Sequence, residues 1–184
     1  MPLLGTRGPS PMVNDKGPAL ITVSVLFTTI AFFTTVLRLW VRKKRRALGW
    51  DDHTITVAMI LTVIEAALTI KAVTRGKGKP SASLPEGDKE FINMYSWYAQ
   101  HVLFAAMASV KISVCLLVTR IKHSYQMKWL TGVVIAVLIA AALEVIIVLL
   151  AQCKPISLYW RPGPGTCWPT EVRIYSIYVQ AGKT

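Results

Sequence analysis

Four apolar stretches, each long enough to cross a bilayer as a helix, restrict the fold of this chain more than any other feature. Residues 19–37 form the first, nineteen positions without a charge. At about 1.5 Å per residue such a run nearly spans a hydrocarbon core of roughly 30 Å. With their flanks, the four predicted spans cover about residues 18–41, 53–72, 91–119 and 129–151. We therefore expect an all-α fold, a polytopic transmembrane helical bundle of four spans.

The segments outside these spans are short. Residues 1–17 are rich in Pro and Gly and lack the charged start and apolar core of a signal peptide, so we expect a disordered extracellular tail. Residues 73–90 combine Gly, Pro, Ser and charge, which predicts an aqueous loop. From about Thr170 to Thr184 the pattern predicts the start of a fifth helix, too short to span.

A dense basic segment joins the first two spans. In VLRLWVRKKRRALGWDDHTI, residues 36–55, six cations precede two aspartates; the cations are Arg38, Arg42, Lys43, Lys44, Arg45 and Arg46. A net charge of +12 would indicate nucleic acid binding in a soluble chain, but here Lys and Arg lie mostly between apolar runs, so we expect no nucleic acid partner. Asp51 and Asp52 are expected to cap the second helix at the positive end of its dipole.

The basic segment also predicts the orientation of the chain. The total numbers of Lys and Arg on the two sides do not decide it, but an early dense cluster favours the cytoplasm. We expect a multi-pass protein, most simply of the plasma membrane, with its N-terminus outside. This loop would then contact anionic lipid, and each basic residue near the surface would contribute about 1 kcal/mol to the attraction. A docking site for a cytoplasmic signalling partner is the alternative role of the loop.

The cysteines differ in their surroundings. Cys153 and Cys167 lie close together in a polar segment rich in Pro and Gly, whereas Cys115 lies inside an apolar run. We predict a disulfide between the first two, on an oxidising outer face, with two free thiols as the alternative. Cys115 is most simply a small buried apolar residue.

Two charged residues interrupt the second and third spans. Glu65 and Lys111 lie at similar predicted depths, about 16 Å and 14 Å from the same end of their helices. Because a charge within the bilayer costs at least about 3 kcal/mol, we predict that the two residues pair across the helices. The alternatives are that the pair only fixes helix register, or that Lys111 snorkels while Glu65 is protonated.

The fourth span carries a stripe of small residues. Gly132, Ala136 and Ala140 precede Glu144 at four-residue intervals, which places all four on one face. Small residues allow helices to approach closely, so we expect this stripe to pack against another helix. Glu144 and His101 have comparable heights and form a second predicted polar site, with Glu144 in a water-filled outer vestibule as the alternative.

Three segments together resemble the fungal family of rhodopsin-like seven-helix membrane proteins, which includes G-protein-coupled receptor-like members. They are LRLWVRKKRRALGWDD, KISVCLLVTRI, and QCKPISLYW ahead of GTC. The family pattern falls on these positions: Gly49, Trp50, Asp51, Asp52, Lys111, Ser113, Arg120, Gln152, Cys153, Pro155, Trp160 and Cys167. The resemblance implies that residues 18–184 form a rhodopsin-like transmembrane domain, a partial seven-helix architecture truncated after the fourth helix.

The function that this resemblance implies is sensing of an extracellular cue. A different class, a small four-helix proton- or cation-coupled transporter acting as a dimer through Glu65, is the main alternative, and a non-functional fragment is another. We expect no enzyme, no metal and no other cofactor, since the sequence contains none of the common catalytic or metal-binding motifs. Retinal is not expected either, because its Schiff-base lysine would belong to a later helix.

Overall fold

A computed structural model of the chain describes residues 16–46, 48–79, 84–121, 124–161, 163–169, 171–172, 174–175 and 178. It contains four long helices: α1 (Gly17–Lys44), α2 (Trp50–Thr74), α3 (Glu86–Ile121) and α4 (Tyr125–Ala151). Each is long and apolar enough to cross a membrane. The all-α, four-span prediction is therefore confirmed. Every helix extends beyond its predicted span, because polar residues at the ends continue the helical turns.

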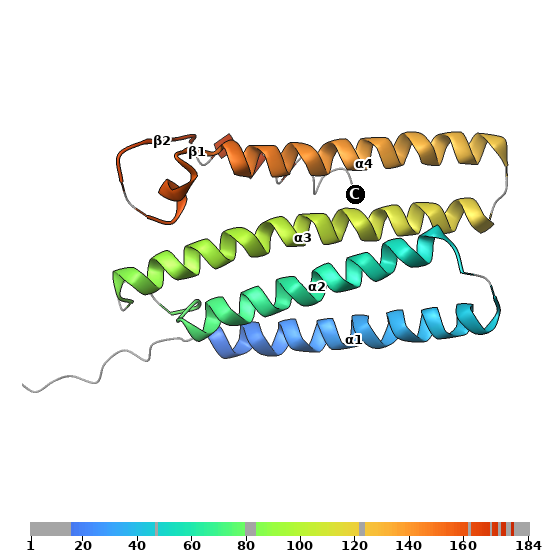
Figure 1. Ribbon diagram of the computed structural model, residues 1–184, viewed down its shortest axis with the longest axis horizontal. Coiled ribbons are helices and arrows are strands. Elements are labelled where there is room, and N and C mark those ends of the chain that lie inside the picture. Colours follow the sequence, from blue (N-terminus) through green and yellow to red (C-terminus); the bar gives the residue numbers. More distant parts are fainter. Residues whose placement is uncertain are drawn as a thin grey trace, which may run out of the picture.

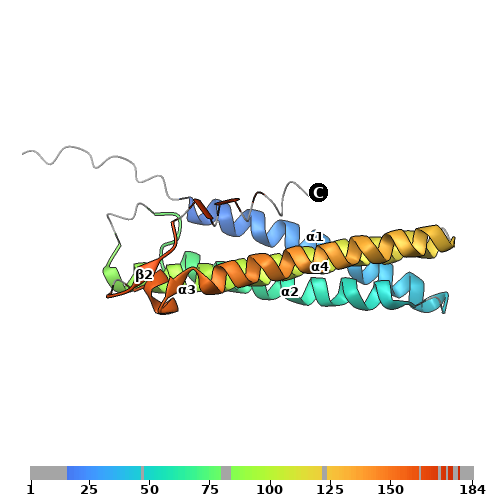
Figure 2. The same cartoon turned by 90° about the horizontal axis from the view of Figure 1, so that it is seen from above.

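The helices lie side by side in the order of the chain. Figure 1 shows α1, α2, α3 and α4 as successive antiparallel neighbours, and Figure 2 shows the same helices from above. Contacts join α1 to α2, α2 to α3 and α3 to α4, and they are most extensive between α2 and α3. Since each outer helix has one such neighbour, α1 and α4 present broad apolar faces to lipid.

The two ends of this layer differ in chemistry. One end, which we call the basic end, contains the connections from α1 to α2 and from α3 to α4. The opposite end, which we call the disulfide end, contains the connection from α2 to α3 and the segment after α4.

Helix α1 packs through a narrow stripe. Its less exposed positions recur every three or four residues, whereas Phe27 and Phe33 on the outer face are each 65% exposed. Thr35 contacts α2 directly, its hydroxyl lying 4.0 Å from the sulfur of Met59. Small and polar side chains dominate the stripe, which lets two helices approach closely. The stripe consists of Gly17, Ile21, Ser24, Thr28, Ala31, Thr35, Arg38 and Arg42.

The start of α3 differs from the prediction. The helix begins at Glu86 rather than near residue 91, so the expected loop over residues 73–90 is shorter than predicted. Pro85 precedes the first turn, and the acidic residues Glu86 and Asp88 within it favour the positive end of the helix dipole. The predicted tail over residues 1–17 lies mostly outside the described residues, although Gly17 already belongs to α1.

A disulfide-linked hairpin follows α4. Strands β1 (Cys153–Lys154) and β2 (Thr166–Cys167) pair antiparallel around the 3-10 helix η2 (Ile156–Tyr159). The predicted disulfide between Cys153 and Cys167 is confirmed. Arg161 joins the hairpin to α3, since its Nη2 lies 2.7 Å from Glu90 Oε1. Of the predicted fifth helix, residues 171–172, 174–175 and 178 have helical backbone, and the rest lies outside the described residues.

We expect the disulfide to stabilise this end measurably. Closing a loop of about 15 residues contributes about 3 kcal/mol, which corresponds to about 6 to 12 °C in Tm for a chain of this size. The double variant Cys153→Ala, Cys167→Ala should therefore lose that much in thermal unfolding of the detergent-solubilised protein. Cys115→Ala, which leaves the disulfide intact, is the control, and an equal Tm for all three proteins would contradict the expectation.

Candidate functional site: a buried cluster of aspartates and arginines

Five charged side chains from three helices meet at the basic end. Asp51 and Asp52 stand in the first turn of α2 and are each only 3% exposed. Arg38 and Arg42 reach them from the last turns of α1, and Arg120 reaches them from the end of α3. We call these five residues the acid–arginine cluster.

Each carboxylate contacts several guanidinium groups. Asp51 accepts hydrogen bonds from Arg38 Nη2 at 3.0 Å, from Arg42 Nη1, and from Arg120 Nη1 at 3.2 Å. Asp52 accepts from Arg42 Nη1 at 3.1 Å, with Arg38 Nε at 3.5 Å and Arg120 Nη1 at 3.9 Å. The bonds from Arg42 and Arg120 to Asp51 therefore place one acidic residue between α1 and α3.

The backbone around the aspartates is built for this contact. Asp52 accepts a hydrogen bond from the backbone N–H of Gly49 at 3.0 Å, so the predicted capping role is confirmed for Asp52. A Cβ atom on Gly49 would lie 2.7 Å from Asp51 Oδ1 and 2.8 Å from Arg120 Nη1. Any larger residue at position 49 would therefore displace the ion pair between Asp51 and Arg120.

A buried hydroxyl fastens α2 to α3 at the same level. Ser113, only 1% exposed, donates from Oγ to the backbone carbonyl of Asp51 at 2.8 Å. The same carbonyl also accepts a hydrogen bond from Thr54 Oγ1 at 3.0 Å, so the Ser113 hydroxyl is the partner that joins it to α3. Ser113 and Arg120 thus hold the first turn of α2 from one side, while the two arginines of α1 hold it from the other.

The charges of the cluster explain its structural role. Two buried carboxylates face three guanidinium groups, which leaves one positive charge in excess. The side chains of Arg38, Arg42 and Arg120 are 28%, 20% and 40% exposed, so water reaches the cations while the anions are covered. Carboxylates that accept several charge-assisted hydrogen bonds are suited to holding helix ends together rather than to exchanging protons.

The predicted basic loop thus divides into two groups. Arg38 and Arg42 belong to the cluster, and the other four cations of the loop are exposed. The charge pattern predicts one surface of six cations, because it does not by itself distinguish them. A signal was present: Arg38 and Arg42 are four residues apart and continue the packing stripe of α1. The four exposed cations are Lys43, Lys44, Arg45 and Arg46.

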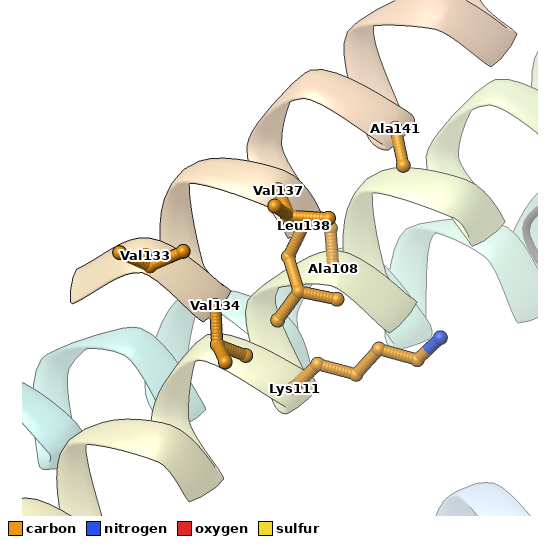
Figure 3. Close-up of a pocket in the computed structure, with 7 residues that line it drawn as sticks. All are labelled: Ala108, Lys111, Val133, Val134, Val137, Leu138 and Ala141. Atoms are coloured by element: carbon orange, nitrogen blue, oxygen red, sulfur yellow. The ribbon is translucent and has the colours of Figure 1, made fainter. Parts of the chain in front are cut away.

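The predicted intramembrane pair does not form. Glu65 accepts a hydrogen bond from Thr69 Oγ1 of its own helix at 2.8 Å. Among the described residues no carboxylate lies within ion-pair distance of Lys111, so Glu65 and Lys111 are not brought together. Lys111 instead borders a cavity of about 340 Å³ between α3 and α4 (Figure 3). The two residues have similar heights along their helices, but height does not determine the face of the helix from which a side chain projects.

The second predicted polar site is also not assembled. His101 Nδ1 lies 2.8 Å from the carbonyl oxygen of Trp97, and its Nε2 is buried without a hydrogen-bond partner among the described residues. The ring of His101 packs 4.1 Å from that of Trp97. Glu144 is exposed on α4. The structure therefore joins His101 to its own helix and not to Glu144.

The small residues of α4 are not packed against a described helix, although Gly132 borders a cavity that α3 also lines. Gly132, Ala136 and Ala140 are all exposed, and a Cβ atom on Gly132 would meet nothing within 4 Å. The prediction that this stripe packs against another helix is wrong for the helices described. Large side chains make the contact instead, because Val145 and Leu149 of α4 form the buried core with Phe104 of α3.

The arrangement offers no metal site among the described residues, where no three His, Cys, Asp or Glu side chains gather closely enough to hold an ion. The acid–arginine cluster is therefore the most highly organised polar site in the part of the chain that the structure describes. Its chemistry is that of a connector between α1, α2 and α3.

We expect Arg42→Gln to destabilise the protein far more than Lys43→Gln. Both changes remove one cation from the same loop, but only Arg42 contacts the buried aspartates. Removing one partner of a buried ion pair costs about 3 to 5 kcal/mol, a value that the partial exposure of Arg42 reduces to about 2 kcal/mol here, whereas a surface change stays within about 0.5 kcal/mol. Thermal unfolding in detergent measures both, and equal losses would contradict the role of the cluster.

These features lie within a region of the chain that matches a known protein family. The fungal rhodopsin domain matches residues 37–180, which include the whole acid–arginine cluster, all of α2, α3 and α4, and the disulfide hairpin. No curated protein and no solved structure matched the chain. The match covers well over half of the 184 residues and agrees with the four apolar helices. The chain is an integral membrane protein that belongs to the fungal rhodopsin domain family.

Proposed function

We propose that this protein senses an extracellular cue at its disulfide end and transmits the change to its basic end. One observation carries the proposal: the acid–arginine cluster joins the ends of three helices, and each of its aspartates contacts more than one arginine. A signalling membrane protein needs helix ends that adopt two arrangements, because a ligand acts by favouring one of them.

The orientation that supports this role has the basic end in the cytoplasm and the N-terminus outside. The exposed cations from Lys43 to Arg46 lie beside the end of α1, where such charges favour the cytoplasmic side. The disulfide lies at the opposite end, where an oxidising compartment would maintain it. The plasma membrane satisfies both conditions.

Arg120 is the movable member of the cluster. It is the most exposed of the three arginines, and its distance to Asp52 is already 3.9 Å. If the end of α3 beyond Ser113 tilts away, Arg38 and Arg42 still neutralise both aspartates. The end of α3 can therefore move without leaving a buried carboxylate unpaired, which lowers the free-energy cost of the second arrangement.

The exposed cations supply the contact with the membrane and its partners. Trp40 and Trp50 flank this loop and are 62% and 81% exposed, as expected for aromatic anchors at the membrane interface. Lys44 Nζ lies 5.7 Å from the centre of the Trp40 ring. We propose that this loop binds anionic lipid of the inner leaflet and lies next to the surface that a cytoplasmic partner recognises.

Cysteine labelling tests the orientation. In a Cys115→Ala background, Gly87→Cys introduces a thiol at an exposed site where its Cβ meets no other atom, and Lys44→Cys introduces one at the basic end. A membrane-impermeant maleimide on intact cells should label Gly87→Cys and reach Lys44→Cys only after permeabilisation. The reverse pattern would overturn the proposed orientation.

Distance measurements test the movable contact. Spin labels at Lys44→Cys and Ile121→Cys report the separation of α1 and α3 at the basic end, since both sites are exposed. We expect Arg120→Gln to broaden the distance distribution or add a longer distance by pulsed electron resonance, because the end of α3 loses its ion pair with Asp51 while the Ser113 bond further along the helix remains. Lys43→Gln is the matched control and should leave the distribution unchanged.

The distance measurement and a separate flux assay together distinguish sensing from transport. An unchanged distribution in the Arg120 variant would contradict the proposed transmission. A proton flux into liposomes that disappears with Glu65→Gln would favour the coupled transporter instead. Glu65 is suited to that comparison because its carboxylate is half-buried and bonded within its own helix.

A further inference from the structure

Lys111 is a cation inside the membrane that has no acidic partner among the residues that the structure describes. It lies nine residues from Arg120 and fourteen from Trp97, so it stands about 14 Å and 21 Å along α3 from these residues. Among the described residues no carboxylate is within ion-pair distance, and Glu65 is bonded to Thr69. A charge at this depth costs at least about 3 kcal/mol, which an anion beside it would offset.

The space beside Lys111 is apolar. Figure 3 shows the extended Lys111 side chain on α3 and the aliphatic side chains that border the same cavity from α4. The cavity measures about 340 Å³ and is partly open; its other lining residues are Ala108, Val133, Val134, Val137, Leu138 and Ala141. A molecule that fills it needs a hydrocarbon body and one anionic group.

A second cavity adjoins the same lysine. It measures about 240 Å³ and lies between α2 and α3. Thr62 of α2 lines it, together with Leu103 and Met107 of α3. Both cavities therefore border the same lysine. This shape suits a long flexible chain better than a compact ring.

We infer that Lys111 binds the carboxylate of a single-chain amphiphile of the fatty acid class, whose hydrocarbon chain occupies these cavities. The size of the site favours one chain, because 340 Å³ is near the lower limit of ligand pockets, about 300 Å³. The depth disfavours a phospholipid, whose permanently charged headgroup stays at the interface. A carboxylic acid can enter the bilayer in its neutral form, and once it has released its proton to water the carboxylate forms an ion pair with the ammonium of Lys111.

This inference extends beyond the sensing role and does not depend on it. A bound amphiphile would bridge α3 and α4 beneath the basic end. The larger cavity is lined by those two helices, and Thr62 of α2 also borders the smaller one, but no residue of either cavity belongs to the acid–arginine cluster. The two sites can therefore be disrupted separately.

Photolabelling of the purified full chain tests the site. The probe is a palmitic acid analogue with a diazirine near the end of its chain, and the matched ligand control is its methyl ester. We expect the acid to label the segments 103–110 and 133–141, as mapped by mass spectrometry, and the ester to label them at least about tenfold less. That factor corresponds to about 1.4 kcal/mol for the lost ion pair.

Protein variants separate charge from shape. Lys111→Met should reduce labelling about tenfold, and Lys111→Arg should retain it. Lys71→Met, which removes an exposed lysine outside both cavities, is the control. Ala141→Phe fills the cavity while keeping the cation, so it should also abolish labelling even if Lys111→Met fails to fold.

Several results would overturn the inference. Equal labelling by the acid and the ester would show apolar adsorption only. Labelling that Ala141→Phe leaves intact would place the probe elsewhere. A phospholipid that co-purifies with the protein and that palmitate does not displace would identify a different occupant. Because binding is read directly, none of these results bears on the distance measurements that test sensing.

Discussion

Two aspartates side by side in a helix that enters a membrane would be costly without cations around them. Asp51 and Asp52 are almost completely covered, and each carboxylate would carry a desolvation penalty of several kcal/mol on its own. Three arginines offset that penalty, and they come from two different helices. Because the guanidinium group offers several donors in a fixed plane, one arginine can bond both carboxylates, as Arg42 does. The ends of α1 and α3 are therefore joined to α2. The same arrangement includes the hydrogen bond from Ser113 to Asp51, and it requires glycine at position 49, where a Cβ atom would collide with Asp51 and Arg120.

The number and location of the helices follow from the sequence because the bilayer imposes a length. Runs without charge that span about 30 Å leave little choice of structure, since every backbone polar group must be satisfied within the segment. The ends are less determined. Glu86 and Asp88 were assigned to a loop on composition, yet they form the first turn of α3, where acidic residues favour the helix dipole. The disulfide was predictable because Cys153 and Cys167 are the two cysteines outside apolar runs.

The contacts between helices were harder to predict, because they depend on which way each residue projects. Glu65 and Lys111 share a depth, but depth along the axis says nothing about direction around it, and each residue turns by about 100°. The prediction for the stripe on α4 failed for a related reason. Ala136 and Ala140 lie on a common face, but their small size does not show whether another helix packs against that face. The cluster was missed although α1 contains the necessary pattern. Its packing stripe ends in Arg38 and Arg42, so the two arginines share the face that meets α2.

The spacing of the cluster along the chain has a consequence for biogenesis. Arg42 and Asp51 are 9 residues apart, and Arg38 and Asp51 are 13 apart, whereas Arg120 and Asp51 are separated by 69. The first two helices can therefore neutralise their charges as a hairpin while the ribosome is still synthesising the rest of the chain. At about 5 to 20 residues per second, α3 follows several seconds later. The nascent hairpin can thus pair its acidic residues before α3 exists, and Arg120 adds the contact from α3 once that helix has been made.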